Sequence, residues 1–83
     1  KAVGLSERTE RLSFKILTIC EKKNVSTSKN PMAMAAAAIN LASLMNGEKI
    51  TQMKISKASG ISAVTIRDRS REIKEKIGGE ING

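Results

Sequence analysis

The stretch between residues 31 and 45 is apolar at almost every position, and it constrains the fold more than any other feature of this sequence. Only Asn40 and Ser43 are polar between Met32 and Met45. A helix that is apolar on all sides must be surrounded by other elements, so we expect this one to be central and buried. One side of the helix carries small residues that would let another helix approach closely: Ala35, Ala38 and Ala42. Larger side chains are expected to fill the space around it: Ile39, Leu41, Leu44 and Met45.

Both ends of this central helix carry recognisable signals. Asn30 is a good capping residue, and Pro31 suits the first helical position because its fixed φ is already helical. Gly47 is expected to end the helix. Asn40 would need hydrogen-bond partners if it is buried.

A first helix is predicted from Ser6, as its cap, to about Lys23, followed by a polar linker over 24–29. Its apolar face contains Leu12, Ile16, Ile19 and Cys20, widened by Phe14 and Leu17. Basic residues recur on another side, at Arg8, Arg11, Lys15 and Lys22. A solvated face explains this basic side better than a DNA contact does.

Residues 51–77 predict a helix-turn-helix. Thr51 can cap a short helix whose inward face holds Ile55 and Ala58, and Gly60 can supply a left-handed turn residue. Ser62 then caps a second helix. The remaining positions of this motif have separate roles: Ile61 packs beneath the corner, Ile66, Ile73 and Ile77 form the inward face, and Val64, Thr65, Arg67 and Arg69 lie elsewhere.

An arginine near the exposed start of such a helix suits the DNA major groove, where it can donate two hydrogen bonds to a guanine edge. Residues 49–76 contain eight Lys/Arg and three Asp/Glu, a local net charge of +5 that favours a polyanion. The alternative to DNA binding is that the two helices are a plain packing unit. The charged residues could likewise be an ordinary helix surface, with Glu72 and Lys76 forming an i, i+4 pair of the kind that many soluble helices carry.

The composition narrows the class of protein. At 83 residues the chain is one small domain or part of one, and a net charge of +7 with a pI near 10.0 points to nucleic acid or another acidic partner. The single cysteine, Cys20, is better explained as a small buried hydrophobe than as a reactive thiol. This cysteine usage favours an intracellular setting.

Several functions lack support in the sequence. Histidine is absent, and neither a metal-ligand cluster nor a glycine-rich phosphate loop is present, so we expect no enzyme activity and no cofactor. The only aromatic residue is Phe14, which argues against base stacking on single strands and favours duplex DNA. No apolar stretch reaches the roughly 20 residues of a membrane span, and no cleavable signal is visible.

Three motifs in residues 30–73 carry a family resemblance. They are AAAAINLAS, TQMKIS and ASGISAVTIR. Together with GLSERTERLSFKILTICEKKN upstream, they resemble the second cyclin-like repeat of archaeal transcription factor B and of general transcription factor IIB. The resemblance covers residues 3–77 and implies an all-α, cyclin-like bundle of about four helices that contains a helix-turn-helix.

The resemblance also implies a function. Family members bind promoter DNA together with TATA-binding protein and help recruit RNA polymerase, and their second repeat reads DNA just upstream of the TATA box. The positions expected to contact bases are Val64, Thr65 and Arg67, and those expected to contact the DNA backbone are Thr51, Gln52, Lys54, Ser62 and Arg69. Asn40 and Ser70 depart from the pattern, since the family usually has tyrosine at both places.

The opening helix of the repeat, the first repeat and the zinc ribbon of the family are not recognisable, so we expect a carboxy-terminal fragment with a repeat over 1–77 and a flexible tail over 78–83. The leading hypothesis is a basal transcription module that is DNA-associated, in the cytoplasm if archaeal and in the nucleus if eukaryotic. The alternative is a cyclin-like protein interaction domain without sequence-specific DNA reading. A third class is a basic chromatin or RNA-binding protein that is insensitive to sequence.

Overall fold

The computed structural model describes residues 6–24, 31–48 and 50–82, and all regular structure in these ranges is helical. Four helices follow one another: α1 (Glu7–Lys22), α2 (Pro31–Met45), α3 (Gln52–Ser59) and α4 (Ala63–Asn82). The all-α fold with four helices is confirmed. The cap expected at Asn30 and linker residues 25–29 lie outside the described ranges.

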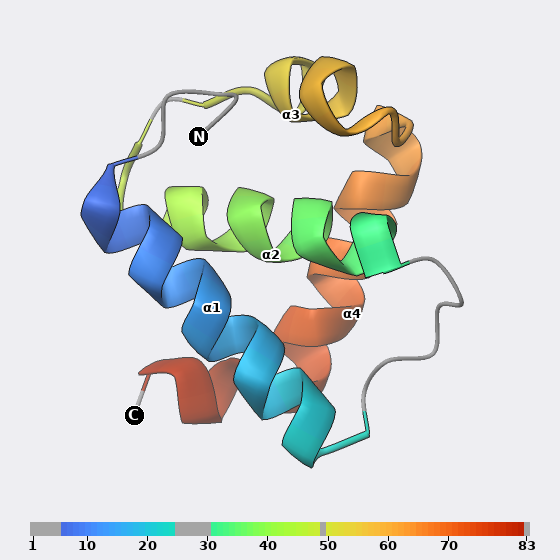
Figure 1. The fold of residues 1–83 in the computed structure, drawn as a ribbon. Helices are drawn as coiled ribbons and strands as arrows, with labels where there is room; N and C mark the ends of the chain where they lie inside the picture. The colour runs from blue at the N-terminus through green and yellow to red at the C-terminus, as the bar shows by residue number, and fades with distance from the viewer. Residues whose placement is uncertain (1–5, 25–30, 49, 83) are drawn as a thin grey trace.

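Helix α2 occupies the centre of the bundle and packs against the other three helices (Figure 1). Its buried alanines are Ala33, Ala36, Ala37, Ala38 and Ala42, whereas Ala35 is half-buried. Because alanine has no bulk beyond Cβ, α1 and α4 can both lie close to α2. The prediction of a central, buried helix is therefore confirmed.

The carboxyl end of α2 is closed by a glycine in the left-handed region. Gly47 has a φ of +71°, and its N–H donates to Leu44 O at 3.2 Å, while Glu48 N–H donates to Ser43 O at 2.8 Å. This pair of bonds is the Schellman motif, which satisfies carbonyls that have no partner inside the helix. Gly47 thus ends the helix as expected.

Helix α1 is capped by Ser6, whose Oγ accepts from Thr9 N–H at 3.2 Å. Its innermost face was only partly predicted: Ile16 and Cys20 are buried as expected, but Thr9 and Ser13 are buried beside them. Their hydroxyls have polar partners, because Ser13 donates to Glu10 O at 2.7 Å and Thr9 Oγ1 accepts from Asn46 Nδ2 at 3.2 Å. Polar groups with such partners can be buried at little cost.

Three other sequence expectations about packing were wrong. The side chain of Phe14 is 67% exposed on the outer side of α1, and Ala58 of α3 is also exposed. Leu44, at 63% exposed, and Met45 do not fill the core. Both belong to the last turn of α2, where the surrounding helices no longer enclose it on every side.

Two buried clusters hold the helices together. The larger cluster joins α1, α2 and α4 through Ile16, Cys20, Met34, Ala37, Ala38, Leu41, Ala42, Ile73, Ile77 and Ile81. The smaller one joins α2, α3 and α4 through Ala36, Ile55 and Ile66, with Ile39, Ile50 and Ile61 at its edge. The helix-turn-helix is therefore anchored on α2 by its own isoleucines.

The tail expected over residues 78–83 needs correction, because α4 continues to Asn82. Ile81 is only 5% exposed and belongs to the larger cluster, four residues after Ile77 on the same face of the helix. Lys23 Nζ also lies 3.1 Å from Glu80 Oε1, which links the end of α1 to the end of α4. Burial of Ile81 offsets the weak helix propensity of Gly78 and Gly79.

Candidate nucleic-acid interface

Local sequence signals build the helix-turn-helix as predicted. Thr51 Oγ1 accepts from Lys54 N–H at 3.1 Å and caps α3, and Ile55 points into the smaller cluster. Gly60 ends α3 with a φ of +77°, and its N–H donates to Ser56 O at 2.8 Å. Glycine suits this position because a left-handed conformation is costly for residues with a Cβ.

Ser62 caps α4 as expected. Its Oγ accepts from Thr65 N–H at 3.2 Å, and its hydroxyl lies 2.9 Å from Thr65 Oγ1. Thr65 is half-buried in this arrangement. When Ser62 donates to Thr65 Oγ1, the Thr65 hydroxyl keeps its own proton available for an outside acceptor.

The first turns of α4 present an apolar and a cationic side chain to solvent. Val64 is 58% exposed, and Arg67 is exposed three residues later on the same side of the helix. Among the described residues, no acid lies within ion-pair distance of Arg67. The surface pairing of Arg67 with Asp68 or Glu72, which was the alternative to DNA contact, is thus not formed.

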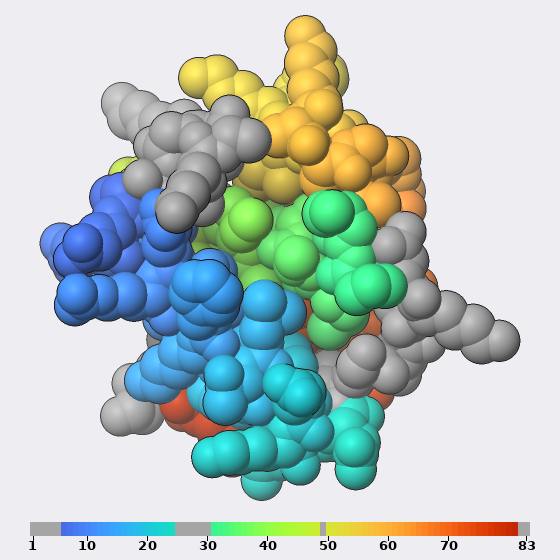
Figure 2. All heavy atoms as spheres, in the orientation of Figure 1, coloured from blue at the N-terminus to red at the C-terminus, as the bar shows by residue number. Residues whose placement is uncertain are grey.

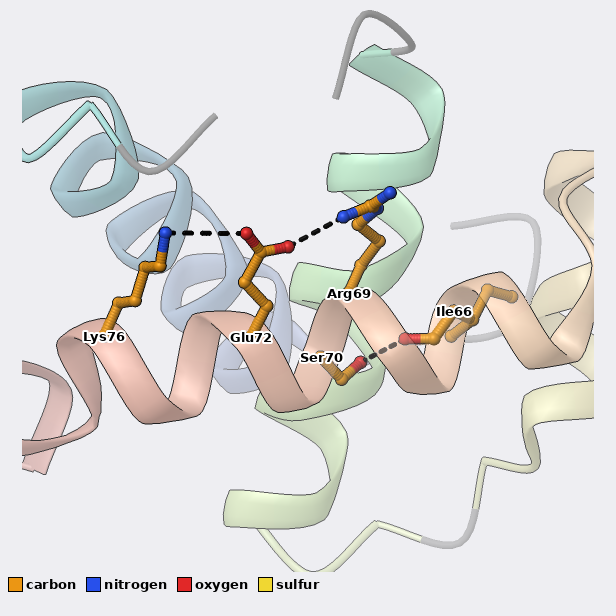
Figure 3. A network of polar contacts seen from close by, with 5 residues as sticks. All are labelled: Ile66, Arg69, Ser70, Glu72 and Lys76. Atoms are coloured by element: carbon orange, nitrogen blue, oxygen red, sulfur yellow. Dashed lines mark hydrogen bonds and ion pairs between the residues drawn. The ribbon is translucent and has the colours of Figure 1, made fainter. Parts of the chain in front are cut away.

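Arg69 lies in a different environment. Its Nη1 donates to Glu72 Oε1 at 2.7 Å, and Lys76 Nζ lies 3.6 Å from Glu72 Oε2, so one carboxylate holds two cations (Figure 3). The predicted Glu72–Lys76 pair is therefore present. Charge on this side of α4 is partly neutralised within the helix, which makes Arg69 a poorer phosphate ligand than an unpaired arginine.

Two further cations lie beside Arg67 on α4. Arg71 and Lys74 are both exposed, and they follow Arg67 by four and seven residues on one side of α4. No ion pair is formed by either residue within the described ranges. The i, i+4, i+7 spacing was visible in the sequence and would have separated these residues from Arg69.

The start of α3 lies close to the same side of α4. Gln52 and Arg67 line one hollow, although they are fifteen positions apart in sequence. Thr51, which caps α3, and Lys54 within it are exposed nearby. In Figures 1 and 2, α3 and the first turns of α4 form one end of the molecule, with long side chains projecting outward.

The remaining residues with possible metal-binding or thiol chemistry are the Asp and Glu residues and Cys20. No group of three or more His, Cys, Asp or Glu is placed to hold a metal ion in the ranges that the structure describes. Cys20 is buried between α1 and α4, and its burial, with a smaller contribution from the Glu72 charge, raises the pKa of the thiol. The thiol is therefore protonated near neutral pH, as expected for a packing residue.

The sequence matches the model of a known protein family. The family model described as the transcription factor TFIIB repeat matches residues 1–76. The chain belongs to the TFIIB repeat family. This match confirms the family resemblance that the sequence motifs indicated. The TFIIB repeat is helical, and the structure of this chain is helical as well.

Relatives of this TFIIB repeat protein are archaeal proteins named transcription initiation factor IIB. The protein of Pyrococcus abyssi is 38% identical over 76 residues, covering 92% of this chain and 25% of the relative. The protein of Archaeoglobus fulgidus is 36% identical over 80 residues, covering 96% of this chain and 24% of the relative. The chain thus spans about a quarter of the length of these relatives. Among the described helices, none is long and apolar enough to cross a membrane.

Proposed function

We propose that this TFIIB repeat is a promoter-binding module of a transcription initiation factor. Its helix-turn-helix contacts duplex DNA upstream of a TATA box, in a complex with TATA-binding protein, and it helps recruit RNA polymerase. Val64, Thr65 and Arg67 contact base edges, with Arg67 donating to a guanine and Val64 packing against a thymine methyl.

One observation carries the proposal: Arg67 is exposed, unpaired within the described residues and next to exposed Val64 at the start of the second motif helix. In helix-turn-helix proteins the amino-terminal residues of this helix contact base edges. Contacts to the DNA backbone are assigned to Thr51, Gln52 and Lys54 at the start of α3 and to Ser62 at the motif corner. Arg69 contributes less, since it is paired with Glu72.

The second candidate is a protein interaction domain that does not read DNA sequence. An apolar surface at the end of α2, where Leu44 and Met45 are exposed, favours this function. The two candidates separate in their response to DNA sequence. A module that reads bases enriches particular sequences, whereas an interaction domain enriches none.

The experiment that separates them is selection from DNA randomised upstream of a TATA box, with and without TATA-binding protein. We expect enrichment of a short guanine-containing motif when TATA-binding protein is present. An Arg67→Ala variant should lose the preference at one base pair and serves as the internal control. A pool that stays random with the unmodified protein would refute base reading.

A further inference from the structure

A groove separates the carboxyl end of α2 from one side of α4. Its volume is about 460 Å³, and its apolar wall is formed by Leu41, Leu44 and Met45 of α2, while Ile81 of α4 also lines the groove. Leu44 and Met45 are the exposed side chains of the last turn of α2. Exposed large apolar side chains that line a concave surface are typical of an interaction site.

The opposite wall of the groove is cationic. Arg67, Arg71 and Lys74 line it from α4, and none of the described residues that line the groove is acidic. The acids of α4 that form ion pairs, Glu72 and Glu80, pair with residues outside it. The three groove cations form no ion pair within the described ranges, so the wall carries uncompensated positive charge.

The floor of the groove adds a polar feature. Asn40 lines it and is only 2% exposed, and its Nδ2 donates to Ser70 Oγ at 3.0 Å. No hydrogen bond among the described residues uses Asn40 Oδ1. A carboxamide oxygen has two lone pairs, so this atom can accept a hydrogen bond from an occupant.

We infer that this groove binds an amphipathic helix of a partner protein, with apolar residues on one side and flanking Asp or Glu residues. The apolar side would pack on Leu44 and Met45, and the carboxylates would face Arg67, Arg71 and Lys74. A helix laid in a groove is a common mode of peptide recognition. The apolar wall and Lys74 lie outside the proposed DNA contacts, whereas Arg67 is shared with them. The inference does not depend on DNA binding, because its test uses no DNA.

Charge complementarity selects this occupant over two others. A second copy of the chain carries the same net charge of +7, so like-charge repulsion opposes its approach to the cationic wall. Duplex DNA could contact Arg67 from outside the groove but would leave the apolar wall uncovered, because sugar and phosphate groups placed against Leu44 and Met45 would lose their hydration. An acidic amphipathic helix satisfies both walls at once.

Direct binding of a peptide probe tests the inference without DNA. The probe is a fluorescent peptide of about 18 residues, long enough to be stapled as a helix. It carries leucines on one face, glutamates beside them and alanines elsewhere. A second probe replaces every glutamate by lysine, and a third has the same composition in scrambled order. We expect anisotropy to show binding of the first probe only, with amide chemical-shift changes confined to the end of α2 and the facing side of α4.

Variants of the groove locate the binding energy. Leu44→Gln should weaken binding of the acidic probe by about tenfold, because one leucine side chain is no longer buried on binding. The matched control is Phe14→Gln, which changes an equally exposed apolar residue on α1. The double variant Arg71→Glu, Lys74→Glu should also weaken binding by about tenfold or more through like-charge repulsion. Its control is Arg8→Glu, Lys15→Glu on α1.

The inference is overturned if the lysine probe or the scrambled probe binds as tightly as the acidic one. It is also overturned if the groove variants and their controls have equal affinities, or if the shift changes lie outside the groove. Because Leu44, Arg71 and Lys74 are exposed, the variants should keep the fold, and circular dichroism would verify this. Failure of DNA binding in a separate assay would leave the groove result unaffected.

Discussion

Asn40 of α2 donates through Nδ2 to Ser70 Oγ of α4 at 3.0 Å, in the interior of the bundle. Ser70 in turn donates to Ile66 O at 2.7 Å, a bond visible in Figure 3, and its Oγ lies 3.2 Å from Ala37 O. These two residues occupy the positions where the resemblance expects tyrosine. Both departures from the family pattern therefore meet in one contact between the central helix and the second motif helix.

Ser70→Ala should destabilise the protein by about 1–3 kcal/mol, because the Asn40 amide loses its acceptor while it stays buried. Asn40→Ala should cost a similar amount, and the double variant should cost less than the sum of the two by about 0.5–1.5 kcal/mol. Urea unfolding of the four proteins measures this coupling. Thr18→Ala is the control, since its hydroxyl makes an exposed bond to Phe14 O within α1. Strictly additive losses would contradict the predicted coupling.

Two glycines should respond in opposite ways to alanine. At Gly60 no atom would obstruct a Cβ, but the φ of +77° is unfavourable for alanine, so Gly60→Ala should cost about 1–2 kcal/mol. At Gly79, which is helical and equally open, alanine should stabilise α4 by up to about 1 kcal/mol. Thermal unfolding of both variants gives the signs. A loss of stability in Gly79→Ala would argue against the continuous helix through residues 78–82.

Arg67→Ala should weaken binding to a preferred DNA site by about 1–3 kcal/mol and remove discrimination at one base pair. Arg69→Ala should have a smaller effect that is equal for all sequences, because its guanidinium is paired with Glu72. The measurement is titration of each variant against DNA with single base changes, in the presence of TATA-binding protein. Full base preference in Arg67→Ala would remove this residue from the proposed site.

DNA binding should weaken as salt rises. If three to five phosphates are neutralised, the logarithm of the association constant should fall with the logarithm of salt concentration with a slope near −3 to −4.5, at about −0.9 for each contact. Arg71→Ala should make this slope shallower by about one unit if Arg71 contacts a phosphate. A slope near zero would mean that the +5 charge of residues 49–76 is only a solvated surface.

Stability should fall in acid through Glu48. Hydrogen bonds from Ser6 and then Thr9 hold the pKa of this carboxyl below its ordinary value of 4.5. The charged form is favoured in the folded state, so the stabilisation is present above the unfolded pKa and is lost as pH falls through the lower folded pKa. Glu48→Gln should flatten the acid limb of a stability–pH curve. In a Ser6→Ala background the same change should have much less effect, and an equal effect there would contradict this coupling.

Much of the secondary structure followed from local sequence alone. Ser6, Thr51, Gly47, Gly60 and Ser62 set helix ends through bonds with residues at most five positions away, so their roles were predictable. The apolar run of α2 likewise required a central place, because no other arrangement removes all its sides from water. The exposed positions of Val64 and Arg67 followed from the isoleucine spacing of α4.

Tertiary contacts decided the rest. The local signal at Gly78 and Gly79 favoured a frayed end, but burial of Ile81 against the larger cluster keeps α4 helical to Asn82. Only the folded chain brings Asn40 to Ser70, or aligns Arg67, Arg71 and Lys74 opposite Leu44 across a groove. These relations join residues on different helices, and helical periodicity specifies the face of each helix but not which neighbour will cover it.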